Sequence, residues 1–414
     1  MESLLSRHAE AFATEVLAAF PAVVLQGARQ VGKSTFAQHL ARGREARTVT
    51  LDDEGLRAAA TADPAAFVDQ AANSLLVIDE LQRAPELILA IKASIDRDRR
   101  PGRFLLTGSS NLLRLPRTPD SLAGRAITVE LRGLSQGELS GRNDDLISRL
   151  RNGFAIGDFE TGTTRDDYAM RIARGGYPEI RDLGGRLRRS WLDSYLERLL
   201  ERDLSDIAPR VNPSRTASVF RLLAGNQAGE LVKSRVARDA GISEASVANH
   251  LDLLETMYLT STIRPWTPNL TSREAARPKV VVNDTALALR VARVAEDQLL
   301  PVESPFIGAA IEGFVATELL KQRTWSAEEF ELFHYRDRNG TEVDLVAEFN
   351  DGTVIAFEVK SAGTVKTEHF RGLTFLRDRL GDRFLGGYVL NRTNRGVSFG
   401  DRLASLPIAA LWEA

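Results

Sequence analysis

The stretch VVLQGARQVGKSTFAQHLA, residues 23–41, constrains the fold more than any other part of the chain. It joins an apolar run to a helical pattern through a loop with the spacing G-x-x-x-x-G-K-S. Gly27 and Gly32 permit backbone conformations that other residues resist, so the loop can turn its amides inward as a cradle for an anion. The following helix adds its positive N-terminal end. The stretch predicts a phosphate-binding loop between a buried strand and a helix.

The side chains of this loop predict ATP as the ligand. Lys33 is expected to reach the β- and γ-phosphates, and the Ser34 hydroxyl to ligate Mg²⁺. The alternative is a glycine-rich turn with a solvated lysine, and the flanking strand and helix argue against it. The predicted nucleotide-binding residues form one continuous run: Gly27, Ala28, Arg29, Gln30, Val31, Gly32, Lys33, Ser34 and Thr35.

Two carboxylates follow a second apolar strand, in LLVIDE at residues 75–80. The end of a strand beside the phosphate loop is where a second magnesium-binding carboxylate is expected, and Asp79 takes that position, directly or through water. Glu80 would polarise the attacking water as a general base. The alternative is a pair of acids that cap a strand. Together with the loop, these residues predict hydrolysis as well as binding.

Two further positions are candidates for sensing or stabilising the transferred phosphate. Ser109 or Ser110, after the strand FLLTG, could contact the γ-phosphate, although a simple turn explains them nearly as well. Arg125, in LAGRA, is predicted to stabilise transition-state charge in its own or a neighbouring subunit. An ordinary surface arginine is the alternative for Arg125.

Residues 20–135 alternate strand and helix patterns. Buried apolar strands separated by helices predict an α/β fold, a parallel sheet with helices on both faces, as in P-loop NTPases. The five expected strands lie within AVVLQ, ARTVTLDD, SLLVIDELQRAP, RFLLTGSS and RAITVELRGLS.

Length and composition set the outer limits. A chain of 414 residues is expected to form two or three domains. Cysteine is absent, which excludes disulfides, thiol catalysis and cysteine-ligated zinc and fits a cytoplasmic protein. No run is long and apolar enough for a membrane span, and the N-terminus has the pattern of an amphipathic helix, not of a signal peptide. The net charge of −2 means that any nucleic-acid surface must be local.

The middle of the chain predicts a helical block that ends in a helix-turn-helix. SWLDSYLERLLERDLSDI is a strong helix, and LVKSRVARDAGISEASVANHLDLLETMYL divides into two helices, with Gly241 as the break and Ser243 as N-cap. The strand-like TSTIRPW would begin a wing. The second helix is expected to bury Val247, Leu251, Leu254 and Met257 and to expose Ser246, Asn249 and His250.

Whether this block contacts DNA stays open at the level of sequence. The second helix carries Glu244, Asp252 and Glu255 and no lysine or arginine, although attraction to phosphates normally dominates affinity for DNA. The alternative is a helical block that packs within the chain or between subunits. Basic residues flank the second helix: Lys233, Arg235, Arg238, Arg264, Arg273, Arg277 and Lys279.

The C-terminal part contains GTEVDLVAEFNDGTVIAFEVK, which predicts a β-hairpin. With Gly352 at the left-handed position of a three-residue loop, Asp344 would pair across from Glu358, and Lys360 would share their face. Two carboxylates and a lysine there could bind Mg²⁺ and position a water for phosphodiester hydrolysis, with Glu312 of the preceding helix as a further carboxylate. The alternatives are an ion-pair ladder that includes Glu342 and Lys360, or a nuclease fold without activity.

The order of these motifs resembles a prokaryotic family in which an AAA-type ATPase module is joined to a C-terminal domain of unknown function. Nearly the whole chain takes part, from GARQVGKST, VIDELQRAP and LAGRAITVELRGLS to RGGYPE, YLERLLERDL and EGFVATELL. The resemblance implies an ATPase domain over residues 1–140, followed by connecting helices and a winged-helix domain over 141–278. Residues 279–414 would form a restriction-endonuclease-like domain, whose motif maps to Glu312, Asp344, Glu358 and Lys360.

The sequence therefore predicts an ATP-binding protein that hydrolyses ATP with Mg²⁺, coupled to DNA binding or processing. The alternative is a regulatory or assembly ATPase whose C-terminal domains mediate interaction without cutting DNA. ATPases of this kind often form rings, so a homo-oligomer is expected, and no membrane partner is.

Overall fold

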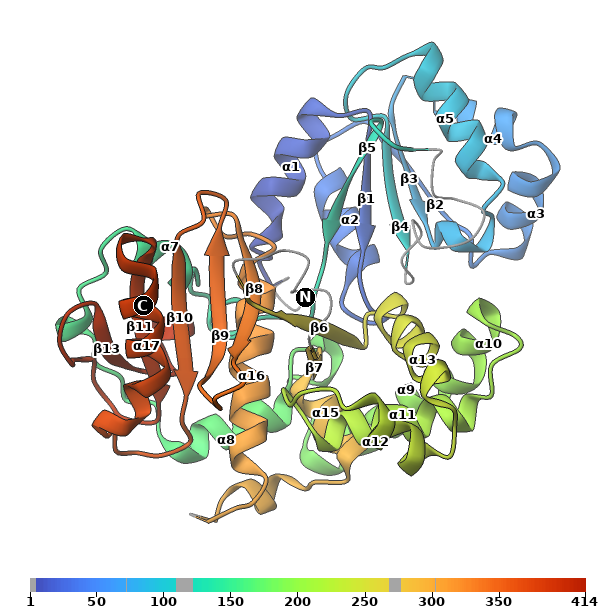
Figure 1. The fold of residues 1–414 in the computed structure, drawn as a ribbon. Coiled ribbons are helices and arrows are strands. Elements are labelled where there is room, and N and C mark those ends of the chain that lie inside the picture. Colours follow the sequence, from blue (N-terminus) through green and yellow to red (C-terminus); the bar gives the residue numbers. More distant parts are fainter. Residues whose placement is uncertain (1–4, 72, 109–121, 268–276, 302) are drawn as a thin grey trace. The chain divides into compact units, whose positions relative to one another are not determined.

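The computed structural model describes residues 5–71, 73–108, 122–267, 277–301 and 303–414. The chain divides into two compact units, each with its own sheet (Figure 1). The first comprises Met1–Gly133 with Glu255–Tyr258, and the second comprises Leu134–Leu254 with Leu259–Ala414. Each unit is described by itself below.

The first unit is built on a five-stranded, fully parallel sheet in the order β2-β3-β4-β1-β5. Its central strands are buried along almost their whole length, as expected for strands covered on both faces. This confirms the predicted P-loop type of α/β fold. The strands are β1 Ala22–Gln26, β2 Ala46–Thr50, β3 Leu75–Asp79, β4 Phe104–Gly108 and β5 Ala126–Glu130.

Helices cover both faces of this sheet (Figure 1). On one face, residues such as Phe67, Ile88 and Ile91 pack with Val24 and Leu106 of the strands into a single apolar core. The helices are α1 Ala9–Ala19, α2 Lys33–Ala41, α3 Glu54–Ala62, α4 Pro64–Asp69 and α5 Leu87–Arg97, with the 3₁₀ turn η1 Leu81–Arg83 after β3.

The second unit begins with helices. The predicted long helix forms as α9 Gly185–Arg198, which continues through a π turn at Leu199–Asp203 into α10 Leu204–Ile207. The two predicted helices of the helix-turn-helix form as α12 Lys233–Ala240 and α13 Glu244–Thr256, with Gly241 left-handed between them (φ +64°). The other helices before the sheet are α6 Gln136–Ser140, α7 Leu146–Arg151, α8 Arg165–Arg174 and α11 Pro213–Gly225, with short 3₁₀ turns at Ile156–Asp158 and Pro178–Ile180.

An eight-stranded mixed sheet forms the core of this unit, in the order β12-β13-β11-β10-β9-β8-β6-β7. It includes β6 and β7, which lie on either side of the predicted domain boundary at residue 278 and pair antiparallel with each other. The boundary itself stays a prediction. The strands are β6 Thr260–Pro265, β7 Lys279–Val282, β8 Phe330–Arg336, β9 Glu342–Phe349, β10 Val354–Val359, β11 Phe384–Asn391, β12 Val397–Ser398 and β13 Leu403–Pro407.

Two apolar cores hold this sheet. One packs Ile311 and Phe314 of α16 against Leu345 and Phe357, and the other packs Leu373 of α17 with residues that include Val346 and Val354. The remaining helices are α15 Thr285–Ala292, α16 Ile307–Gln322, α17 Arg371–Leu380 and α18 Ala410–Glu413, with 3₁₀ turns at Glu296–Leu299, Thr367–Phe370 and Gly381–Arg383.

The predicted β9–β10 hairpin is confirmed. Its register runs from Val354 opposite Glu348 to Phe357 opposite Leu345, so the next pair in step is Glu358 opposite Asp344. Gly352 occupies the loop with φ +78°, the left-handed conformation that the three-residue loop requires. The register therefore places the two carboxylates across from each other.

A buried histidine on β8 makes the stability of this unit pH-dependent. His334 is 1% exposed, and burial, helped by Lys279, lowers its pKa from 6.5 to about 4. As the pH falls, His334 takes up a proton at a higher pH in the unfolded chain than in the folded protein. Protonation therefore favours the unfolded chain, and stability is lost as the pH falls from 6.5 towards 4. We expect this histidine alone to lower the unfolding free energy by about 3 kcal/mol at pH 4.

Tryptophan fluorescence measures this effect, because all four tryptophans lie in the second unit: Trp191, Trp266, Trp325 and Trp412. Denaturant unfolding of the native protein and of His334→Gln would be compared between pH 7 and pH 4. The native protein should lose more stability than the variant. Parallel pH profiles for the two proteins would contradict the assignment.

Candidate functional site

The predicted phosphate loop connects β1 to α2 and is shaped by its two glycines. A Cβ atom at Gly27 would lie 2.0 Å from the backbone oxygen of Leu131, so only glycine fits there. Gly32 is the N-cap of α2 and is left-handed, with φ +93°. The side chain of buried Arg7 donates to the backbone oxygen of Val31 at 2.9 Å and ties the loop to the N-terminal segment.

Lys33, the first residue of α2, is folded back onto this loop. Its Nζ donates to the backbone oxygens of Gly27 at 3.0 Å and Ala28 at 2.8 Å, and its side chain is 5% exposed. Burial lowers its pKa to about 8, although Glu80 and Asp79 act in the opposite sense. Among the described residues, the hydrogen-bond partners of this buried ammonium are both neutral carbonyls, so it is poised to bind an anion.

Ser34 and Asp79 meet across α2 and the end of β3. The Ser34 hydroxyl lies 2.8 Å and 3.0 Å from the two carboxylate oxygens of Asp79, although the residues are 45 positions apart in the chain. A hydroxyl and a carboxylate are oxygen donors of the kind that Mg²⁺ prefers. These residues therefore fit a magnesium ion that also binds the nucleotide's phosphates.

Thr107, at the end of β4, contacts both Asp79 and Glu80 and was not predicted from the sequence. It is fully buried, its hydroxyl donates to Asp79 and it accepts the backbone N–H of Glu80 at 3.1 Å. Glu80 itself is left-handed, with φ +59°, and its carboxylate accepts a hydrogen bond from the amide of Gln82. The contact follows from the adjacency of β3 and β4 in the sheet, which the structure shows.

Removing the Thr107 hydroxyl is expected to slow ATP hydrolysis and leave ATP binding nearly unchanged. Thr107→Val keeps the shape but leaves Asp79 and the Glu80 N–H without this partner, which should lower kcat by roughly tenfold. Steady-state kinetics would separate kcat from KM, and Thr107→Ser, which retains the hydroxyl, is the control. A valine variant with native kcat would contradict this role.

Among the other predicted site residues that the structure describes in this domain, Arg125 is not part of the group formed by Lys33, Ser34, Asp79 and Thr107. Arg125 makes a two-pronged ion pair with Asp96 of its own chain, at 2.8 Å and 2.9 Å, which raises the pKa of Arg125. Its predicted role toward a phosphate stays a prediction and would require release from Asp96. Ser109 and Ser110 lie outside the described residues. Gln30 is exposed on the loop, and Thr35 is exposed on the first turn of α2.

A second polar cluster lies in the C-terminal unit and is centred on a lysine that sequence reasoning had assigned only to a possible DNA surface. The Nζ of Lys279, on β7, lies 2.6 Å from Glu312 Oε1, 3.2 Å from Asp344 Oδ1 and 3.7 Å from Glu342 Oε1. The Lys279 side chain is 3% exposed. The structure thus brings Glu312 and Asp344 together around a buried cation.

The remaining predicted residues of this cluster pair with each other. Lys360 Nζ lies 2.5 Å from Glu358 Oε1, and Asp344 Oδ2 accepts the Val359 N–H at 2.9 Å. Burial and the Asp344 charge raise the pKa values of Glu312 and Glu358 to about 7. Burial lowers the pKa of Lys279, but the surrounding carboxylates outweigh this and raise it above the ordinary value.

These carboxylates do not fit a divalent ion in this arrangement. The Lys279 ammonium already neutralises the space between Glu312 and Asp344. Among the residues that the structure describes, no group of three or more histidine, aspartate or glutamate side chains could hold a metal ion. No pattern in the sequence indicated that Lys279 belongs to this cluster, because it lies 33 positions from Glu312 and 65 positions from Asp344.

The helix-turn-helix surface differs in part from the prediction. Val247, Leu251, Leu254 and Met257 are buried as expected. The expectation that His250 faces outward is wrong: it is 7% exposed and its Nδ1 lies 2.9 Å from the Thr216 hydroxyl. Of the three predicted contact residues, Asn249 is exposed and Ser246 is half-buried against Ser243.

Three segments match protein-family models. Residues 19–140 match a family described as an AAA domain, residues 165–298 a domain of unknown function (DUF8612) and residues 307–411 a domain of unknown function (DUF4143). The chain is 29% identical over 345 residues to the uncharacterised protein Rv2008c of Mycobacterium tuberculosis strain H37Rv, a match that covers 83% of this chain and 71% of the relative.

Two solved structures are similar at low identity. The Walker-type ATPase paby2304 of Pyrococcus abyssi is 15% identical, with a TM-score of 0.44 over 70% of this chain and 96% of that one. AMPPCP-bound DnaA from Aquifex aeolicus is 14% identical, with a TM-score of 0.30 over 59% of this chain and 85% of that one.

The phosphate loop, the parallel sheet and the match of residues 19–140 define the class of protein: a P-loop ATPase. More particularly, the ATPase domain is of the AAA type, and a DUF4143 domain follows it later in the chain. No helix among the described residues is both long and apolar enough to cross a membrane.

Proposed function

We propose that the first unit hydrolyses ATP with Mg²⁺ at the loop of residues 27–35, and that nucleotide state controls a DNA contact made by the second unit. The observation that carries the ATPase assignment is the convergence of Ser34 and Asp79 beside a buried Lys33. Within the described part of the chain, the hydrogen bonds of Lys33 Nζ go to loop carbonyls. ATP would replace these carbonyls as the partner of the ammonium.

Each residue has a separate task in the proposed reaction. The loop amides and Lys33 bind the phosphates, and Ser34 with Asp79 would hold Mg²⁺, which supplies charge neutralisation at the phosphates when bound. Glu80 accepts a proton from the attacking water as general base. Thr107 positions Glu80 through its backbone N–H and Asp79 through its carboxylate.

ATPase assays with and without duplex and single-stranded DNA test both halves of this proposal. Lys33→Ala should reduce hydrolysis to background, because the phosphates lose their buried cation. A Lys33→Ala protein that hydrolyses as fast as the native one would refute the site. If DNA neither stimulates the native enzyme nor binds at low salt, the DNA half fails while the ATPase half stands.

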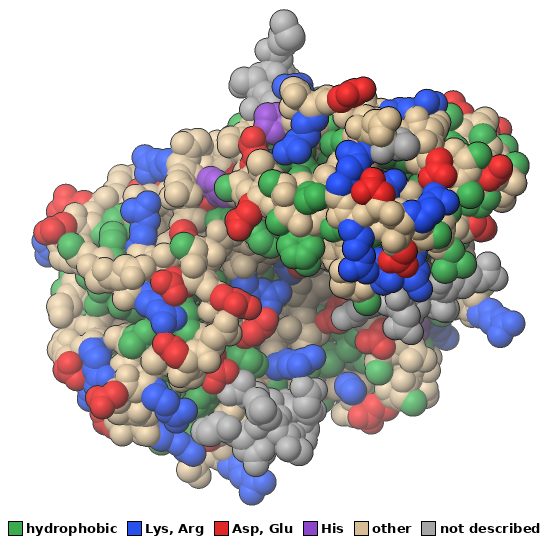
Figure 2. All heavy atoms as spheres, turned by 90° about the horizontal axis from the view of Figure 1, so that it is seen from above, with side chains coloured by type: hydrophobic (Ala, Val, Ile, Leu, Met, Phe, Trp, Pro, Cys, Tyr) green, Lys and Arg blue, Asp and Glu red, His purple; other side chains and the backbone are tan. Residues whose placement is uncertain are grey.

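Support for a DNA contact comes from the basic residues of one helix, since the surface as a whole is not basic. Figure 2 presents a face on which acidic and basic side chains are interspersed, in keeping with the net charge of −2. Lys233, Arg235 and Arg238 are exposed on α12, the helix before the proposed recognition helix α13. We infer a winged-helix contact in which α12 binds phosphates and Asn249 of α13 reaches toward the bases.

Cleavage of DNA by the C-terminal domain is the less favoured reading of the Glu312, Asp344, Glu358 and Lys360 motif. The position of Lys279 among the carboxylates favours the second candidate function, a nucleotide-controlled ATPase whose C-terminal domain mediates interaction without cutting. A nuclease assay with magnesium and with manganese, comparing native protein and Lys360→Ala, distinguishes the two. Metal-dependent cleavage that Lys360→Ala abolishes would overturn the second candidate.

We also propose a cytoplasmic homo-oligomer in which Arg125 of one subunit acts on the ATP of its neighbour. The ion pair with Asp96 would then hold Arg125 in the subunit's own chain until assembly. Mixing Arg125→Ala with Lys33→Ala protein tests this, because each defect would lie at a different interface. Sedimentation with and without ATP measures assembly directly, and a monomer under both conditions would refute the proposal.

A further inference from the structure

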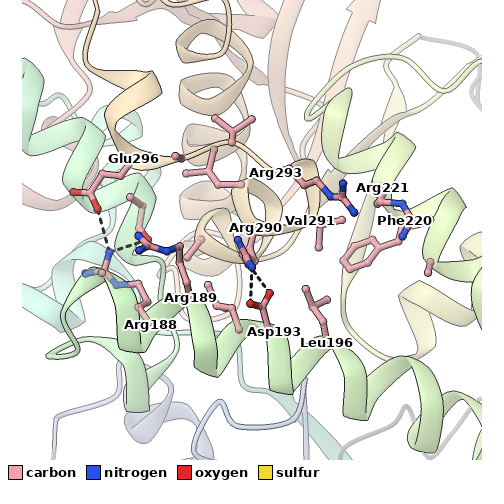
Figure 3. Close-up of a pocket in the computed structure, with 18 of the residues that line it drawn as sticks. Arg188, Arg189, Asp193, Leu196, Phe220, Arg221, Arg290, Val291, Arg293 and Glu296 are labelled. Carbon is pink, nitrogen blue, oxygen red and sulfur yellow. Dashed lines mark hydrogen bonds and ion pairs between the residues drawn. The ribbon is translucent and has the colours of Figure 1, made fainter.

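A cavity of about 570 Å³ lies in the second unit between α9, α11 and the end of α15 (Figure 3). Its lining residues fall between Ala173 and Glu296, inside the segment that matches DUF8612. The volume lies within the roughly 300–1,000 Å³ of typical small-molecule sites. We propose that this cavity binds a small organic anion, in which a phosphate, sulfonate or carboxylate group is joined to an apolar body.

The lining is strongly cationic. Five arginines face the cavity against one aspartate and one glutamate, an excess of three positive charges: Arg188, Arg189, Arg221, Arg290 and Arg293 with Asp193 and Glu296. The chain as a whole carries a net charge of −2, so this concentration is local. Guanidinium groups bind carboxylates, phosphates and related anions through paired hydrogen bonds.

Three of these arginines have partners within the chain, among them Arg221, which donates to the Ser218 hydroxyl at 3.0 Å. Arg290 makes a two-pronged pair with Asp193 at 2.5 Å, and Arg188 contacts Glu296 at 3.5 Å and the backbone oxygen of Ala173 at 3.2 Å (Figure 3). These contacts neutralise both acids of the lining. The Arg290–Asp193 pair joins α15 to α9, and Arg188 joins α9 to α8 and to the 3₁₀ turn that begins at Glu296.

Arg189 and Arg293 are left as candidate anion-binding side chains at two places on the cavity wall, Arg189 beside Arg188 and Arg293 beside Arg221 (Figure 3). Within the described ranges of the chain, neither side chain forms a hydrogen bond or an ion pair, and both are exposed at the cavity. Arg293 ends α15 in the left-handed conformation, with φ +59°, where glycine is the usual residue. The chain therefore keeps a cationic side chain at a position where glycine would relieve backbone strain.

The rest of the lining is apolar. Leu192 and Phe220 are buried, and Leu196, Leu289 and Val294 are half-buried. An isolated phosphate would leave this surface uncovered, and a DNA backbone has no apolar group to fill it. A compact molecule with an anionic end and an apolar end satisfies both halves of the cavity.

The dye 1-anilinonaphthalene-8-sulfonate has this composition and is the probe for the first test. It would be titrated into the full-length protein by fluorescence, with saturating ATP and magnesium to occupy the phosphate loop. We expect saturable binding that Arg189→Gln/Arg293→Gln weakens by roughly tenfold or more, because charge-assisted hydrogen bonds are lost. Arg198→Gln, an exposed arginine of α9 outside the cavity, should bind the dye as the native protein does.

Competition keeps the proposal testable if the double variant misfolds. Phenyl phosphate should displace the dye from native protein at lower concentration than either inorganic phosphate or phenol. Dye binding that is absent, or that the double variant leaves unchanged while folded, would overturn the proposal. Displacement by a DNA oligonucleotide but not by phenyl phosphate would also overturn it.

Discussion

Glu80→Gln is expected to abolish ATP turnover while ATP still binds. The amide retains the size of the side chain but cannot accept the proton of the attacking water, and loss of a general base costs roughly 10²–10⁴-fold in rate. The ammonium of Lys33 and the Ser34–Asp79 pair remain in place in this variant. Single-turnover hydrolysis and equilibrium binding of a fluorescent ATP analogue measure the two properties separately.

The matched control is Glu86→Gln, which removes an exposed carboxylate six positions further along the same domain. It should hydrolyse ATP at the native rate. Lys33→Ala, in contrast, should lose binding as well as turnover, because it removes the buried cation. A Glu80→Gln protein that retains a large part of native turnover would mean that another group activates the water.

Lys279→Met is expected to destabilise the second unit by about 3–5 kcal/mol, the usual cost of removing one partner from a buried ion pair. Methionine fills a similar volume but leaves the carboxylates of Glu312 and Asp344 buried without a cation. Denaturant unfolding followed by tryptophan fluorescence reports this change, since all four tryptophans belong to the second unit.

Lys360→Met is the comparison, because the Lys360 side chain is 33% exposed and, among the described residues, forms one ion pair, with Glu358. It should cost about 1 kcal/mol or less, as partly solvated pairs do. As the pH is lowered from about 8 to 6, the unfolding free energy of Lys279→Met should rise more than that of the native protein. Burial raises the pKa of Glu312 to about 7, and its protonation removes an uncompensated charge. Equal losses for the two variants would contradict a central role for Lys279.

The parts of the molecule that could be predicted from sequence are those with local patterns. The strand AVVLQ forms β1 at the predicted residues, because five consecutive buried positions leave little choice of structure. The hairpin register followed from period-two alternation and one glycine in the loop, since a slip of one residue would turn every side chain to the other face.

The misses all involve partners distant in the chain. Thr107 lies 28 positions from Asp79, Lys279 lies 65 from Asp344, and Arg7 lies 24 from Val31. No periodicity or motif encodes such contacts. His250 was wrongly assigned to an outer face because helical periodicity locates the main core but not a single polar contact, here with Thr216.

The pairing of β6 with both β7 and β8 affects how the chain can be divided. A fragment that ends before residue 330 would contain β6 and β7 but expose the edge of β6, with its unpaired amides and carbonyls open to strands of other molecules. Synthesis from the N-terminus creates the same situation for a time, since the neighbouring strand is made some 65 residues later. The middle segment is therefore poorly suited to expression on its own, because its sheet is completed only by β8.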